Sequence, residues 1–297
     1  GVVGKLNAGG TISYVTNYAQ VQAKDCMNVG GIVGFAGTPV TYGTKSDAYS
    51  EYTANPSGYN TFVLNCGNNA TIQGFYKLGG IVGENAATVM YCYNTGYILP
   101  HMHGSGGGWG GIAGRNGNNN IATEESIIAY CYNTGTITNN GKNDDGSETI
   151  KGYAGIAGMN YGGKGHNLIY NCYNIGAIPK GRNNYGSITN NLEYSKPNDV
   201  VYSNCSLDTT TINNYSQEFW KTGTVLSEAD FKATTYTDTS VLALLGHAYV
   251  ADTQNINNGY PVLRWQVDSV EPTLTSILIL SEPTKTAYNA TDVFDPT

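Results

Sequence analysis

Residues 79–98 read GGIVGENAATVMYCYNTGYI, and this stretch contains the pattern from which the fold can be predicted. A Gly-Gly pair leads a short apolar strand, several polar residues turn the chain, and a second strand carries Cys-Tyr-Asn-x-Gly-x-Ile. The pattern returns in residues 110–137, as GGIAG and YCYNTGTI, and in residues 154–178, as AGIAG and NCYNIGAI. Self-similarity at a recurring spacing indicates a repeat architecture, which determines the fold more strongly than local propensity does.

Two further copies precede these three. Residues 1–21 hold a degenerate copy, and residues 30–72 hold GGIVG and NCGNNATI on either side of a Tyr-, Thr- and Ser-rich insert at 38–60. One aligned column then contains Val15, Cys66, Cys92, Cys131 and Cys172, to which we also assign Cys205. A second column contains Asn17, Asn68, Asn94, Asn133 and Asn174. Alternation along a strand places the cysteines on one face and their Tyr neighbours on the other.

Units of this size cannot bury an apolar face alone and must stack on copies of themselves. We therefore predict an all-β fold, a β-helix-like solenoid whose right hand follows from the crossover rule. Ile, Val and Cys should point inward, and each Asn amide should bond the same amide one rung away. A β-propeller is the alternative, because its blades have similar periods. The spacing varies from 26 residues between Cys66 and Cys92 to 41 between Cys131 and Cys172. Rungs accommodate such inserts more easily than blades.

Three segments are predicted. Residues 1–205 form the repeat solenoid, and residues 206–268 form a small mixed cap that closes its open sheet edge. Within the cap, Ser227 and Asp230 indicate a short helix start, 241–247 a second helix, and NGYPVLRW at 258–265 a turn and an edge strand. Residues 269–297 form a linker and the start of another domain. Because the chain opens inside a repeat, we expect a segment of a longer protein whose partners include its own flanking domains.

The copies of G-[GA]-I-[VA]-G followed by [YN]-C-Y-N-x-G-x-I resemble the GLUG-type (Gly-Leu-any-Gly) repeats of secreted and surface proteins of gut bacteria. The usual Leu is replaced at the corresponding positions by Ile32, Ile81, Ile112 and Ile156. Residues 277–297 are similar to the opening of a bacterial immunoglobulin-like domain. The resemblance implies a secreted or cell-surface, extracellular location. It leaves the activity open, because such arrays occur in adhesins, proteases and carbohydrate-active enzymes.

The composition excludes two classes of partner. The chain has a net charge of −7 and only 12% charged residues, whereas nucleic-acid binding requires clustered Lys and Arg. The sequence has no run of eighteen apolar residues, so we predict no membrane insertion.

The cysteines and histidines predict no metal or other cofactor. Five of the six cysteines fall in one repeat column, which favours buried reduced thiols over the disulfides that an extracellular chain would otherwise suggest. No Cys-x-x-Cys pair indicates zinc. The pair His101 and His103, and the acidic run from Asp144 to Glu148, are more typical of solvated loops than of metal sites.

The repeat strands offer little for catalysis. Glu84 stands alone, with Arg115 and Met159 at the equivalent positions of the next copies, and neither Gly-x-Ser-x-Gly nor His-Glu-x-x-His occurs. We therefore predict a non-catalytic structural or adhesin-like module that displays loops. The alternative is an accessory or catalytic segment of a secreted carbohydrate-active enzyme or protease.

Tyrosines provide the remaining candidate site. Tyr93, Tyr132 and Tyr173 recur on the face opposite the cysteines, and an aromatic row facing solvent could bind a host glycan or a surface protein. We take these three residues as the predicted ligand-binding residues. The competing interpretation is a ladder of Tyr rings that only stiffens the solenoid.

Overall fold

The computed structural model describes residues 1–37, 61–101, 108–117, 125–138, 152–160, 166–178, 185–189, 200–202, 205–207, 224–235 and 240–267. All of them belong to one compact unit, Gly1–Val267. The predicted linker and immunoglobulin-like start at 269–297 lie outside the described residues. Strands make up about half of the described part, and helices are few and short.

Most strands are short, parallel and stacked in four sheets, which we call A to D. Sheet A consists of β1 (Val3–Leu6), β5 (Val33–Gly37), β9 (Val82–Ala86), β14 (Ala113–Asn116) and β18 (Ala157–Asn160). Sheet B consists of β2 (Thr11–Ser13), β6 (Phe62–Leu64), β10 (Thr88–Met90), β15 (Glu125–Ala129), β19 (His166–Tyr170) and β22 (Val200–Tyr202).

Sheet C consists of β3 (Thr16–Asn17), β7 (Gly67–Asn68), β11 (Tyr93–Asn94), β16 (Tyr132–Asn133), β20 (Tyr173–Asn174), β23 (Cys205–Leu207) and β24 (Thr224–Leu226). Sheet D consists of β4 (Val21–Gly30), β8 (Ile72–Gly79), β12 (Ile98–Pro100), β13 (Trp109–Gly110), β17 (Tyr153–Ala154) and β21 (Tyr185–Gly186).

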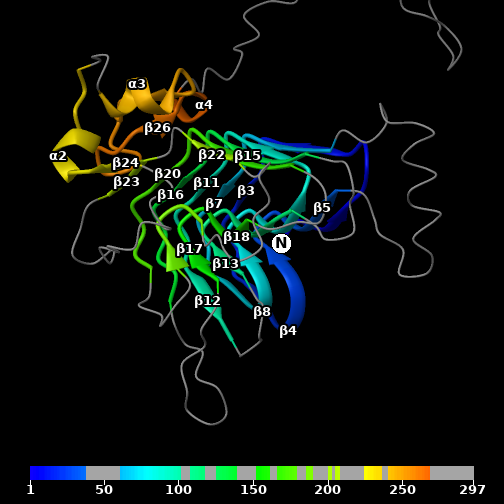
Figure 1. Ribbon diagram of the computed structural model, residues 1–297. Helices are drawn as coiled ribbons and strands as arrows, with labels where there is room; N and C mark the ends of the chain where they lie inside the picture. Colours follow the sequence, from blue (N-terminus) through cyan, green and yellow to red (C-terminus); the bar gives the residue numbers. More distant parts are fainter. Residues whose placement is uncertain are drawn as a thin grey trace, which may run out of the picture. The chain divides into compact units, whose positions relative to one another are not determined.

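From β1 to β21 the chain visits the sheets in the order A, B, C, D and returns to A, with β12 and β13 both in sheet D, so each repeat contributes strands to successive sheets (Figure 1). The strands β22, β23 and β24 then extend sheets B and C. Stacked parallel strands in several sheets are compatible with the predicted solenoid and do not form a closed barrel. Inserts leave the register intact. The strand β8 pairs with β12 at one end, where Ile72 faces Ile98, and with β13 at the other, where Leu78 faces Trp109.

Each predicted second strand is divided between sheets B and C by a residue with positive φ. This residue directly precedes the Cys column, and its φ lies between 50° and 57° at Tyr14, Asn65, Tyr91, Tyr130 and Asn171. Asn tolerates this left-handed conformation, whereas a bulky side chain adopts it rarely. The bend therefore ends the sheet B strand and begins the sheet C strand, where the sequence pattern indicated one continuous strand.

The core between the sheets contains the predicted apolar columns. Ile32, Ile81, Ile112 and Ile156 are fully buried, as are four cysteines of the repeat column, Cys66, Cys92, Cys131 and Cys172. These four cysteines, called the column cysteines below, form no disulfide, as predicted. The backbone N–H groups of Cys66 and Cys92 each approach the sulfur of the next column cysteine at 3.4 Å.

The assignment of Cys205 to this column is wrong. Tyr202 pairs with Tyr170 in sheet B, and Cys205 pairs with Tyr173 in sheet C. Cys205 therefore lies one residue beyond the position of Cys172. The rest of the repeat motif has decayed around Cys205, so the cysteine alone does not determine the register there. Only the backbone of Cys205 belongs to the described part.

Two ladders of buried amides run through the rungs. In the predicted ladder each Asn Nδ2 donates to the Oδ1 of the next rung, at 2.8, 2.7, 2.8 and 2.8 Å along Asn17, Asn68, Asn94, Asn133 and Asn174. A second ladder, which the sequence analysis missed, joins Asn85, Asn116 and Asn160 at 2.8 and 2.9 Å. In both ladders every amide donates toward the later rung.

The second glycine of the Gly-Gly pair faces the first of these ladders. A Cβ at Gly80 would lie 2.4 Å from Asn94 Cγ, and a Cβ at Gly111 would lie 2.2 Å from Asn133 Cγ. No other residue leaves room for the amide at that distance. The two halves of the sequence motif thus specify each other: the second glycine of one half accommodates the asparagine of the other.

The C-terminal segment is mixed, as predicted. It contains α2 (Glu228–Phe231), α3 (Val241–Leu245), the antiparallel pair β25 (Tyr249–Val250) and β26 (Val262–Leu263), and α4 (Arg264–Val267). Ser227 caps α2 in a capping box with Asp230, which confirms the predicted helix start. Helix α4 was not predicted. In Figure 1 this segment, in yellow and orange, lies beside β20, β23 and β24.

Candidate functional site

The three predicted ligand-binding tyrosines form a stacked column on sheet C. The rings of Tyr93 and Tyr132 have centroids 5.4 Å apart and planes 14° apart, and those of Tyr132 and Tyr173 are 5.0 Å and 5° apart. They point away from the column cysteines, as the alternation predicted. The stacking agrees with the competing interpretation, a ladder of rings that joins successive rungs.

The expectation that this row faces solvent is wrong. Tyr93, Tyr132 and Tyr173 are 8%, 1% and 0% exposed, because the C-terminal segment packs an apolar layer over them. Phe231 and Tyr249 contact the ring of Tyr173. A sugar or a protein partner could reach these rings only if that layer were removed.

The C-terminal segment also forms hydrogen bonds with the tyrosine hydroxyls. Tyr132 Oη lies 3.0 Å from Gln266 Nε2, and Tyr173 Oη accepts from Asn257 Nδ2 at 2.8 Å while it donates to the carbonyl of Pro261. Burial raises the pKa of Tyr132 and Tyr173 well above the usual value for tyrosine. These hydroxyls therefore stay neutral and serve as structural anchors for the cap.

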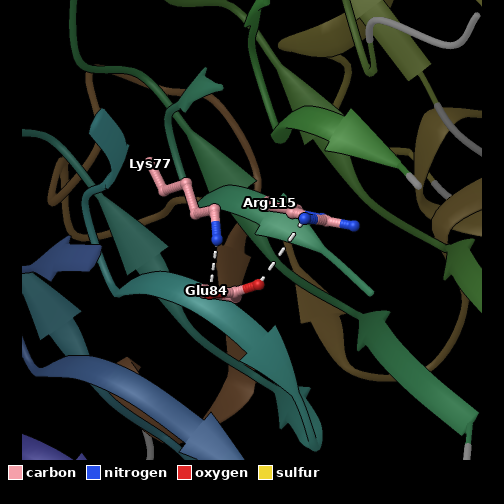
Figure 2. A network of polar contacts seen from close by, with 3 residues as sticks. All are labelled: Lys77, Glu84 and Arg115. Atoms are coloured by element: carbon pink, nitrogen blue, oxygen red, sulfur yellow. Dashed lines mark hydrogen bonds and ion pairs between the residues drawn. The ribbon is translucent and has the colours of Figure 1, made fainter. Parts of the chain in front are cut away.

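Sheet A carries a buried charge cluster formed by Lys77, Glu84 and Arg115 (Figure 2). Lys77 Nζ lies 2.6 Å from Glu84 Oε2, and one guanidinium nitrogen of Arg115 lies 3.7 Å from Glu84 Oε1. Glu84 and Arg115 occupy paired positions on β9 and β14, as the repeat alignment predicted, and Met159 follows on β18. Lys77 comes from the end of β8, which the alignment did not connect with Glu84.

The chemistry of this cluster is that of an ion pair network. Burial is the main influence on Lys77 and lowers the pKa of its ammonium, while Glu84 raises it. A glycoside hydrolase needs two carboxyl groups about 5–10 Å apart, in contact with substrate. Within the described residues no second carboxylate joins Glu84 in the cluster. The geometry thus gives Glu84 the role of a counter-ion for two cations.

No metal site is formed by the described part of the chain, in which no three His, Cys, Asp or Glu side chains gather. Burial raises the pKa of the thiols of Cys92 and Cys131, and a protonated thiol is a poor ligand. Of the residues weighed from the sequence, His103 and the acidic run at 144–148 lie outside the described residues.

A different group of aromatic side chains reaches the surface. Tyr14 and Tyr18, in the first rung, are 71% and 76% exposed, and they flank Thr16 on β3. Trp265 is half-buried and meets Tyr14 edge-on, with ring centroids 6.0 Å apart. We call Tyr14, Tyr18 and Trp265 the first-rung aromatic surface. This surface was not predicted because the first copy of the repeat is degenerate, although the alternation of side chains about Thr16 indicates it.

Comparison with known proteins adds no assignment, since no family model, curated protein or solved structure matches this chain. The described helices are all too short to cross a bilayer.

Proposed function

We propose that this chain is a non-catalytic structural module of a secreted or cell-surface bacterial protein, built as a right-handed β-solenoid that displays loops. The observation that supports it best is the use of the repeated polar side chains. In both amide ladders the side chains form hydrogen bonds with the equivalent side chains of adjacent rungs, and in the charge cluster Glu84 pairs with Lys77. These polar groups therefore hold the stack together. The right hand follows from the general preference of parallel crossovers. The location follows from the resemblance to GLUG-type repeats.

The places where inserts interrupt the pattern support a display role. The longest separates β5 from β6, another separates β12 from β13, and a third precedes β17, yet the strands on either side keep the register of the neighbouring rungs. A stack of rungs therefore accepts loops of different length at its bends while its interior stays constant.

Replacing residues 139–151 by a short Gly-Ser turn tests this role. We expect an unchanged far-ultraviolet circular dichroism spectrum and a thermal midpoint within about 3 °C, because the rungs on either side supply their own bonds. Loss of cooperative unfolding would show that the insert belongs to the core and would contradict a display function. As a check on the non-catalytic role, the unmodified chain should hydrolyse neither polysaccharide nor casein.

A further inference from the structure

We propose that the first-rung aromatic surface binds neutral carbohydrate, with Tyr14, Tyr18 and Trp265 stacking on sugar rings. This goes beyond the structural function above and places the contact away from the buried tyrosine column. Four observations carry it: the exposure of the rings, the conformation of Tyr14, the fixed orientation of Trp265, and the uncharged polar groups between them.

The conformation of Tyr14 is the most informative. Tyr91 and Tyr130 share its positive φ, but their rings stack 5.3 Å apart and pack against the C-terminal layer, so burial offsets the strain. Tyr14 has a φ of 55° and keeps 71% of its surface exposed. Asn65 and Asn171 fill the same position with a residue type that tolerates the conformation. A tyrosine held in a strained conformation with its ring in solvent indicates a role for the ring itself.

Trp265 is held in place before any ligand arrives. Its indole N–H donates to the carbonyl oxygen of Tyr91 at 2.8 Å, and its ring centroid lies 5.9 Å from that of Tyr93. The side chain of the next residue, Gln266, is also held: its Oε1 accepts from the backbone N–H of Leu263 at 2.9 Å, and its Nε2 donates to the hydroxyl of Tyr132. Rigid aromatic side chains lose little conformational entropy on binding, which favours a stacking role.

Polar, uncharged side chains lie next to these rings in the described part of the chain. Asn69 donates to the Tyr93 hydroxyl at 3.5 Å, and the Thr95 hydroxyl donates to Asn69 Oδ1 at 2.7 Å. Asn17 on β3 pairs with Asn68 on β7, so the residues that follow them, Tyr18 and Asn69, occupy neighbouring positions in adjacent rungs. Thr16 lies between Tyr14 and Tyr18 in the chain. Hydroxyl and amide groups next to aromatic faces match the hydroxyl groups and C–H faces of a pyranose.

The side chains that form this surface favour a neutral ligand over an anionic one. None of the side chains Tyr14, Thr16, Tyr18, Asn69, Thr95 and Trp265 is charged at neutral pH. An anionic ligand such as a nucleic acid or a sulfated glycan would find no cation among them to pair with. A neutral oligosaccharide requires only stacking and hydrogen bonding, so we assign this class to the surface.

The test is a titration of the full chain with linear hexasaccharides of glucose, xylose and mannose, followed by tryptophan fluorescence and calorimetry. We expect millimolar-class binding to at least one of them. Tyr14→Asn should lower the association constant about fivefold, since one stacked aromatic contact contributes about 1 kcal/mol. The same variant should retain or raise the thermal midpoint, because Asn suits the left-handed backbone. Tyr18→Ala should also weaken binding about fivefold.

Tyr97→Ala is the matched control, since Tyr97 is a 56% exposed tyrosine that lies outside the first-rung aromatic surface. Its association constant should equal that of the unmodified chain. The proposal is overturned if none of the three hexasaccharides binds at about 10 mM, or if both surface variants bind as well as the control. Should Tyr14→Asn fail to fold, Tyr18→Ala alone decides between these outcomes.

Discussion

Removal of one amide from the middle of the first Asn ladder should be among the most damaging small changes to this protein. Asn94 is fully buried and takes part in three hydrogen bonds: it accepts from Asn68 at 2.7 Å, and its Nδ2 donates to Asn133 at 2.8 Å and to the carbonyl of Gly96 at 3.0 Å. Asn94→Ala abolishes all three. At about 0.5–1.5 kcal/mol for each net hydrogen bond, we expect a loss of about 2–4 kcal/mol in the free energy of unfolding.

Position along the ladder supplies the control. Asn17 begins the ladder and shares one ladder bond, to Asn68, besides its local bonds with Ala19. Asn17→Ala removes one bond between rungs, whereas Asn94→Ala removes two, and the local bonds of Asn17 are only partly buried, so water can replace them. Asn17→Ala should therefore cost less, about 1–2 kcal/mol. The double variant Asn94→Ala/Asn133→Ala should cost less than the sum of its single changes, because both remove the same mutual bond.

Urea unfolding followed by circular dichroism measures these differences. At an m-value of about 2 kcal/mol/M, the Asn94→Ala variant should lose about 1–2 M in its midpoint with little change in slope. A loss below about 0.5 kcal/mol, or an equal loss for Asn17→Ala and Asn94→Ala, would refute the view that the amide ladder holds the rungs together.

Three further predictions concern buried groups. Glu84→Gln removes the carboxylate that pairs with Lys77 and Arg115 and should cost about 3 kcal/mol in urea unfolding, whereas Glu228→Gln, in the exposed pair with Lys232, should not shift the midpoint; equal effects would contradict the assigned burial of Glu84. Thiol labelling of the native chain should be fast at exposed Cys26, while the column cysteines react only at the rate of unfolding; rapid labelling of any column cysteine without denaturant would count against the closed core. Because burial raises the pKa of Tyr132 in the folded state, stability should be constant below about pH 9 and should fall above about pH 10, where the unfolded state releases the proton first; the urea midpoint from pH 8 to 11 measures this, and Tyr132→Phe should flatten the decline.

The sequence alone predicted the repeated interior because stacking places like residues on like. Cys92 and Asn94 lie in columns that every copy repeats, so their inward direction and their bonding partners followed from the alignment. The same reasoning failed at Cys205, where the surrounding motif no longer fixed the register. The repeat alignment therefore predicts the register of a residue only where several columns of the motif are present together.

Features that join different columns were not predicted. The contact between Gly80 and Asn94 links the two halves of the motif, and Lys77 meets Glu84 from a different strand position, which no column comparison shows. The bend at Tyr91 was missed because a tyrosine rarely adopts positive φ, so nothing in its identity signals one.

The predicted exposure of the tyrosine column was wrong because residues distant in the sequence cover it. Alternation correctly placed Tyr132 opposite the cysteines, but it could not show what covers that face. The covering residues, such as Gln266, lie more than a hundred residues later and outside every repeat. A segment predicted to close a sheet edge instead covers the outer face of sheet C, and only its strand β24 extends that sheet.

The uniform direction of the amide ladders makes the two ends of the stack chemically different. Head-to-tail alignment adds the amide dipoles of successive rungs, much as peptide dipoles add along a helix. The row therefore presents an oxygen at Asn17 and an NH₂ group at Asn174. A rung that joins the Asn17 end must bring a donor. At the other end β23 already follows β20, and Asn174 Nδ2 donates to the carbonyl of Gly176 in its own rung. Two such stacks placed with their first rungs together would oppose oxygen to oxygen, so the interior chemistry permits stacking in one orientation only.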